Sequence, residues 1–242
     1  MFTAPRRQEI DHRTIKLIVG VVATSLAGLT RLFAGSTLPS ISASYYEGGW
    51  SQTIFIGFLF AIAAFLLAYN GVSRAEMILS KVAAVAGLGI ALFPCRPSIL
   101  PDPQRAPGVA GLGIALFPCR SDTYAELIPH VHGVSAAVMF LMLAYFCYGF
   151  YRRARAKGHA QANARATLYA VCGAAILISI IVLALDHVSG GVVSTRIPNL
   201  TYYGEATGLI SFGISWLTAS RSLPVLTHPG ERFSPFREGN PP

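Results

Sequence analysis

The sequence predicts an all-α integral membrane protein, a bundle of six transmembrane helices. The 242-residue chain is 53% hydrophobic and only 12% charged, whereas a soluble domain carries about a quarter charged residues. The apolar residues gather in runs near the roughly 20 residues that cross a bilayer. The predicted spans are Ile15–Phe33, Ile54–Tyr69, Met77–Phe93, Ile128–Tyr151, Thr167–Leu185 and Tyr203–Ala219.

Basic residues predict the orientation of these spans. Of the 19 Lys and Arg residues, one lies inside the first span (Arg31), and those on the side opposite the termini are Arg96, Arg105, Arg120 and Arg196. Since cytoplasmic loops are enriched in Lys and Arg, both termini should be cytoplasmic and the protein should lie in the inner (plasma) membrane. The +8 net charge then serves orientation, and no nucleic-acid partner is expected.

The chain divides into a cytoplasmic tail (1–14), a transmembrane domain (15–220) and an irregular cytoplasmic tail (221–242) that is rich in Pro and charge. The sequence VAGLGIALFPCR occurs at both Val85–Arg96 and Val109–Arg120. The second copy is too short to cross the membrane. Segment 97–120 is therefore either a re-entrant or surface-lying element of the outer face, or a passive duplication, which we favour. The repeat also places Cys95 and Cys119 on the outer side, where an oxidising compartment permits a disulfide.

Ionisable residues gather at the outer ends of three predicted spans. His132 opens the fourth span, Asp186 and His187 close the fifth, and Glu205 lies just inside the sixth. Because hydrocarbon tolerates such groups poorly, their clustering at one depth suggests a functional site. Imidazole and carboxylate are zinc ligands. A zinc ion held by His132, Asp186 and His187, with Glu205 as base, could activate water to attack a lipid ester or amide.

The spacing of these residues is not specific for metal. His130 and His132 point to different sides of a regular helix, so they share a metal only if His130 precedes the helix, as Pro129 permits. A haem between His132 and His187 is a further, weaker hypothesis. The plainer alternative is a set of interfacial polar groups, with Arg31 paired to Asp186 or Glu205. We expect no cofactor, and zinc is the alternative. A transporter is disfavoured because spans two to five hold no ionisable residue near mid-membrane.

Several segments resemble a family of bacterial polytopic membrane proteins of unknown function, related loosely to the FRAG/DRAM/Sfk-type membrane proteins. They are LPSISASYY, SQTIFIGFLFAIAAFLLAYNG, VAGLGIALFP and EATGLISFGISWLTAS, with His132 opening the fourth span. The resemblance covers most of the membrane domain and implies a six-span bundle without an assigned activity. A more distant resemblance is to multi-span metal hydrolases of ceramides, but their histidine pair one helical turn apart is missing here.

The sequence thus favours a non-enzymatic membrane component that binds lipid or a partner protein through a polar site at the outer ends of the helices. The alternative is a metal-dependent hydrolase of lipid esters or amides at the outer leaflet.

Overall fold

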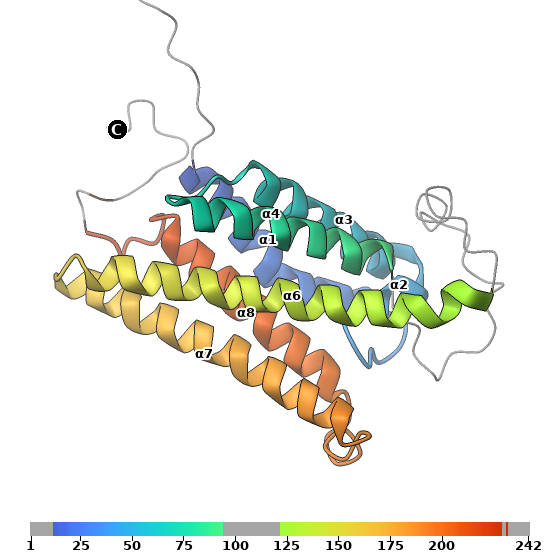
Figure 1. The fold of residues 1–242 in the computed structure, drawn as a ribbon. Coiled ribbons are helices and arrows are strands. Elements are labelled where there is room, and N and C mark those ends of the chain that lie inside the picture. The colour runs from blue at the N-terminus through green and yellow to red at the C-terminus, as the bar shows by residue number, and fades with distance from the viewer. Residues whose placement is uncertain (1–11, 94–121, 229–230, 232–242) are drawn as a thin grey trace, which may run out of the picture.

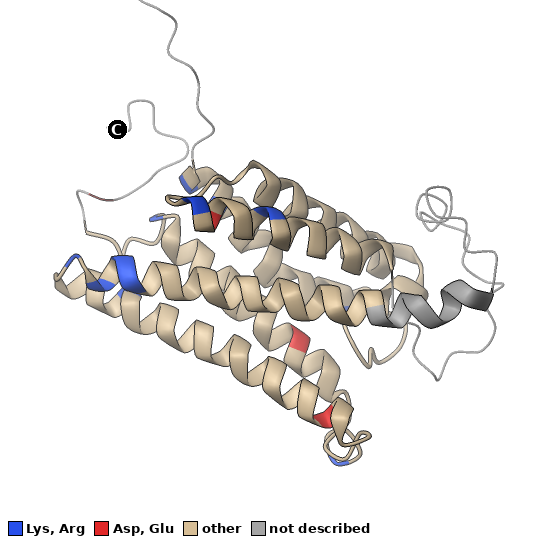
Figure 2. Cartoon of the chain, in the orientation of Figure 1, with Lys and Arg blue, Asp and Glu red and all other residues tan. Residues whose placement is uncertain are grey.

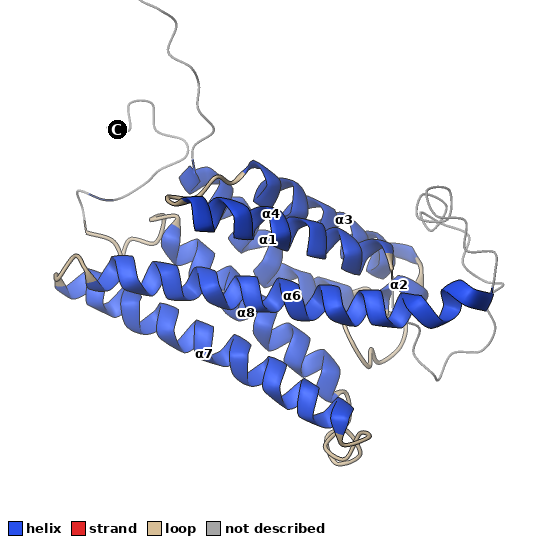
Figure 3. Ribbon diagram, viewed as in Figure 1, coloured by secondary structure: helices blue, strands red, loops and turns tan. Residues whose placement is uncertain are grey.

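The structure, a computed structural model, describes residues 12–93, 122–228 and 231, and at 122–130 it describes the backbone alone. The predicted disulfide between Cys95 and Cys119, the repeat segment 97–120 and most of both tails lie outside these residues. The described part is all-helical (Figure 3). Its elements are α1 (His12–Leu32), α2 (Ser44–Glu47), α3 (Gly49–Ala68), α4 (Arg74–Leu92), α6 (Asp122–Arg155), α7 (Ala160–Val188) and α8 (Leu200–Ala219).

Five helices are long and apolar enough to cross a membrane, namely α1, α3, α4, α6 from Val131 onward, and α7. This confirms the prediction of a helical multi-pass membrane fold. The sixth predicted span, α8, has a suitable length of 20 residues but does not belong to that apolar set. Six crossings and cytoplasmic termini therefore stay predictions. Most helices extend beyond their predicted spans because polar flanking residues continue the helical backbone, as α6 does through Arg155.

The long helices form a ring in which each packs against the next along the chain, and α8 returns to pack against α1. Figure 1 shows α1, α4 and α7 running one way and α3, α6 and α8 the other. Short connections between antiparallel neighbours produce this order. The first and last described segments consequently meet at the same end of the bundle, where Lys and Arg also gather (Figure 2).

The contact between α1 and α8 is a close backbone crossing. A Cβ atom added to Gly213 would lie 2.1 Å from Thr24 Oγ1 and 2.8 Å from Gly20 O. The Thr24 hydroxyl is itself turned back, donating to Gly20 O at 2.7 Å. Small residues allow helix backbones in a membrane to approach this closely, which maximises packing contacts where lipid offers no hydrophobic driving force.

A buried ion pair fixes the end of the bundle that carries the termini. Glu76 in the first turn of α4 pairs with Arg153 of α6, and only 4% of the glutamate side chain is exposed. The carboxylate also accepts the Val72 N–H at 3.0 Å. Beside the pair, the Trp216 ring of α8 lies 5.2 Å from the Tyr69 ring. The cost of burying charge is offset here by the partner and by the backbone hydrogen bond.

We predict that Gly213→Ala destabilises the bundle, because its Cβ meets the backbone of α1 and cannot be relieved by a side-chain movement. Overpacking of this kind costs about 1–3 kcal/mol. The measurement is thermal unfolding of purified protein followed by circular dichroism. Gly28→Ala is the matched control, since nothing lies within 4 Å of its added Cβ. Equal melting temperatures for the two variants would contradict the close crossing.

Candidate functional site

The segment between α1 and α2 folds back onto the start of α8. Leu38 and Ile41 are buried within the core. The Ile41 N–H donates to Glu205 Oε2 at 2.5 Å, and the Tyr202 N–H donates to Pro39 O at 3.1 Å. Tyr202 also ties α8 to α1, since its hydroxyl donates to Ala27 O at 2.9 Å. The Glu205 carboxylate therefore satisfies a backbone N–H of this loop and holds the loop against α8.

His132 of α6 caps the end of α4. Its Nδ1 lies 3.0 Å from Phe93 O, and Phe93 is the residue at which α4 ends. A carbonyl only accepts, so Nδ1 carries a proton and donates to it. With 6% of the residue exposed, the imidazole satisfies one of the carbonyls that every helix leaves open at its C-terminus.

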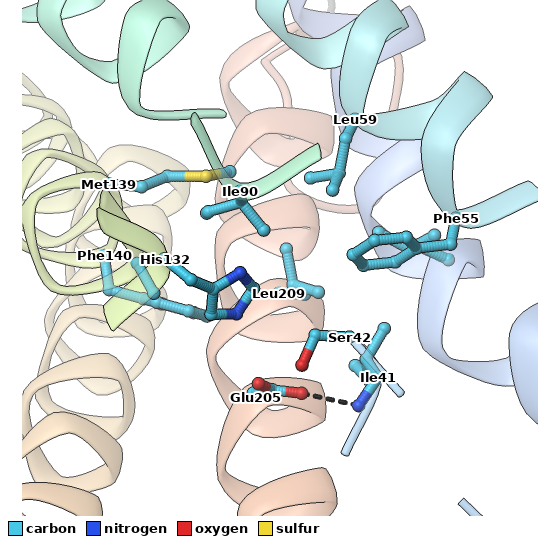
Figure 4. A pocket seen from close by; sticks show the side chains of 12 residues that line it. Ile41, Ser42, Phe55, Leu59, Ile90, His132, Met139, Phe140, Glu205 and Leu209 are labelled. Carbon is cyan, nitrogen blue, oxygen red and sulfur yellow. Dashed lines mark hydrogen bonds between the residues drawn. The ribbon is translucent and has the colours of Figure 1, made fainter. Parts of the chain in front are cut away.

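Glu205 and His132 line a common cavity of about 30 Å³, which is room for about two water molecules. Figure 4 shows both side chains directed into it, with Ile41 and Ser42 beside the carboxylate. Its other walls are apolar. The remaining lining residues are Leu26, Phe55, Leu59, Ile90, Ala136, Met139, Phe140 and Leu209.

Asp186 and His187 lie elsewhere. Asp186 Oδ1 accepts the N–H groups of Val193 and Ser194 at 2.8 and 2.9 Å, so this carboxylate orders the connection from α7 to α8. His187 is exposed. Neither residue lines the cavity. Within the described part of the chain, no three His, Cys, Asp or Glu side chains are grouped so that they could hold a metal ion. The zinc and haem hypotheses stay predictions, and these contacts do not support them.

Two details of the predicted group of ionisable residues at the outer helix ends differ in the structure. Arg31 is exposed and lies over the Tyr202 ring, 5.0 Å from its centroid, and the ion pairs among the described residues do not include it. Positions 130 and 132 lie in one continuous helix that begins at Asp122. The condition for a shared metal, a His130 that precedes the helix, is therefore not met.

The partners of this site could not be read from the sequence. Glu205, His132 and Asp186 each bind backbone atoms of a loop or a helix end. Backbone groups carry no sequence signal, since nearly every residue supplies the same donor and acceptor. The loop LPSISASYY is distinctive in the sequence only by its resemblance, and no pattern marks Ile41 and Ser42 within it as cavity residues.

Comparison with protein-family models, with curated proteins and with solved structures gave no match. The class of protein therefore rests on the chain itself. Its apolar helices define a multi-pass helical membrane protein. A small, mostly apolar cavity lies between α1, α3, α4, α6, α8 and the loop before α2, and Glu205 and His132 line it.

We predict that Glu205→Ala loosens the loop at residues 38–43. Hydrogen bonds to charged groups contribute about 1.5–3 kcal/mol, so amide exchange in this loop should accelerate about tenfold or more. Glu205→Gln, which keeps an acceptor oxygen, should have a smaller effect. The measurement is hydrogen–deuterium exchange with mass spectrometry.

Glu47→Ala is the control for that experiment. Its carboxylate accepts from the Ser36 hydroxyl rather than from a backbone group of the loop at 38–43. Exchange that stays unchanged in Glu205→Ala, or that rises equally in Glu47→Ala, would show that Glu205 does not hold the loop.

Proposed function

We propose that the protein is a six-span membrane protein with cytoplasmic termini that binds an amphiphilic small molecule, such as a membrane lipid, at the Glu205–His132 cavity. The supporting observation is the composition of that cavity, whose walls are apolar except for Glu205, His132 and Ser42. Ligand sites are typically apolar with a few oriented polar groups.

The polar groups of the cavity favour one kind of headgroup. An ionised Glu205 carboxylate only accepts hydrogen bonds, and the Nε2 of a neutral His132 protonated at Nδ1 does the same. A headgroup with N–H or O–H donors, such as an ammonium or a hydroxyl, complements them. A carboxylate or phosphate headgroup would face the negative charge of Glu205 without a cation to balance it.

The size of the cavity implies that binding involves the loop before α2. About 30 Å³ holds water but no alkyl chain. The loop is held on α8 by the Ile41–Glu205 and Tyr202–Pro39 hydrogen bonds. A headgroup that donates to Glu205 can replace the Ile41 N–H, and displacement of Ile41 would extend the apolar space for a chain.

Binding without catalysis is the function that we favour. The alternative of a metal-dependent lipid hydrolase requires His132, Asp186 and His187 to act together, and no observation on the described residues favours that arrangement. The resemblance to the FRAG/DRAM/Sfk-type membrane proteins stays a prediction and assigns no activity in either case.

We predict that a long-chain alkylamine bearing a photoreactive diazirine labels the cavity residues of the protein in lipid nanodiscs. Ala136→Trp should abolish this labelling because it fills the cavity that Ala136 lines. Ala137→Trp is the matched control, since Ala137 is adjacent but exposed. Labelled residues are identified by peptide mass spectrometry.

The second part of the labelling experiment varies the headgroup of the probe. The alkylamine and the corresponding alkyl alcohol should label the cavity, and Glu205→Gln should reduce capture of the amine severalfold because the opposite charge is lost. A carboxylate probe of equal length should label it weakly. Equal labelling by all three probes, or equal labelling of both Trp variants, would overturn the proposal.

A further inference from the structure

The segment that follows α8 returns to the bundle at the end opposite the cavity. Its Glu231 lies where α6 ends, α7 begins and α8 ends. Three cationic side chains from these helix ends contact the one carboxylate. Lys157 follows α6, Arg165 lies in the second turn of α7, and Arg221 follows α8.

The two carboxylate oxygens of Glu231 have different partners. Oε1 accepts from Lys157, and His159 Nε2 lies 4.0 Å from the same oxygen. Oε2 accepts from Arg165 Nη2 and from Arg221 Nη1, both at 3.0 Å. Partial burial alone would raise the pKa of Glu231, but the Lys157 hydrogen bond and the charges of Arg221 and Arg165 outweigh it and lower this pKa to about 2. The carboxylate is therefore ionised at neutral pH.

Within the described residues, the cations are incompletely compensated. Three cationic side chains face one carboxylate there, and the Arg165 side chain is fully buried, with 0% exposed. Its Nη1 donates to Leu226 O at 2.5 Å, while its Nε has no partner within the described residues. A buried charge without full compensation is costly. Arg221 also adopts a left-handed backbone with φ of 66°, a conformation that costs energy for a residue other than glycine.

We propose that Lys157, Arg165 and Arg221 form a binding site for a phosphate group, and that Glu231 occupies this site as an internal competitor. The site is separate from the Glu205–His132 cavity and does not depend on its function. Guanidinium groups offer paired donors that match phosphate oxygens. A phosphate has more acceptor oxygens than a carboxylate, so it can bind all three cations and reach the open Arg165 N–H.

The location supplies two sources of phosphate. The three cations lie at the end of the bundle where Lys and Arg gather (Figure 2), the end that the positive-inside rule assigns to the cytoplasm. Anionic headgroups of the inner leaflet and free phosphate are both within reach there. Both sources carry the phosphate group that the site recognises, and the experiment below distinguishes the lipid from the free anion.

The test removes the competitor, and two double variants then restore the net charge of the wild type. Glu231→Gln should bind phosphate several-fold more tightly than the wild type. The double variant Glu231→Gln with Arg155→Gln restores the net charge through an exposed arginine outside the cluster, and the gain should persist. In Glu231→Gln with Arg221→Gln, of identical net charge, the gain should disappear.

The binding of two probes is measured on the full chain. Titration calorimetry with inorganic phosphate in detergent reports on the free anion. Native mass spectrometry from nanodiscs of phosphatidylglycerol, against nanodiscs of phosphatidylcholine, reports on the anionic headgroup. A gain in the first measurement alone assigns a soluble phosphate, and a gain in the second alone assigns a lipid.

Unchanged binding of both probes in Glu231→Gln would overturn the proposal and leave Glu231 as a structural clamp on the end of the chain. Equal gains in the two double variants would overturn it as well, because the effect would then be general electrostatics. The melting temperature of each variant is measured in parallel, so that unfolding is not mistaken for lost binding.

Discussion

The close crossing of α1 and α8 is the contact on which the rest of the structure depends. The other helix neighbours in the ring are also neighbours in sequence, whereas α1 and α8 lie far apart in the chain and meet at Gly20 and Gly213. This crossing turns a row of helices into a ring. It brings Leu26 of α1 and Leu209 of α8 to the same cavity and lets Tyr202 reach Ala27 O. Since lipid provides no hydrophobic force between helices, the fit of small residues and the Tyr202 hydrogen bond hold α1 against α8.

A second constraint governs the polar residues. Within hydrocarbon every polar group needs a protein partner, and the ends of helices and the loops between them are the places where backbone groups are still free to provide one. Glu205, His132 and Asp186 all use such groups: Ile41 N–H, Phe93 O, and the N–H groups of Val193 and Ser194. A carboxylate or imidazole at the end of an apolar span therefore has a structural role before it has any chemical one. The cavity is distinguished by the fact that two such groups share it.

These two constraints also explain what the sequence could predict. Run length and hydropathy identified the helices, because crossing hydrocarbon requires both. The sequence carries no signal for the backbone atom that each side chain binds. His132, Asp186, His187 and Glu205 therefore looked like one group, whereas Asp186 binds the loop between α7 and α8. Arg165 was read only as an orienting charge, because its burial depends on the returning segment that carries Leu226 and Glu231.

The two proposed sites lie at opposite ends of the same helices and select opposite charges. α6 carries His132 near one end and is followed by Lys157 at the other; α8 carries Glu205 near its start and is followed by Arg221. An ionised Glu205 in the cavity disfavours a phosphate, while the three cations of the cluster disfavour an ammonium. One headgroup therefore cannot serve both sites. This opposition follows the charge asymmetry of the chain, because the Lys and Arg residues that orient the helices are concentrated at one end, and the cavity at the other end is left without a cation in its walls.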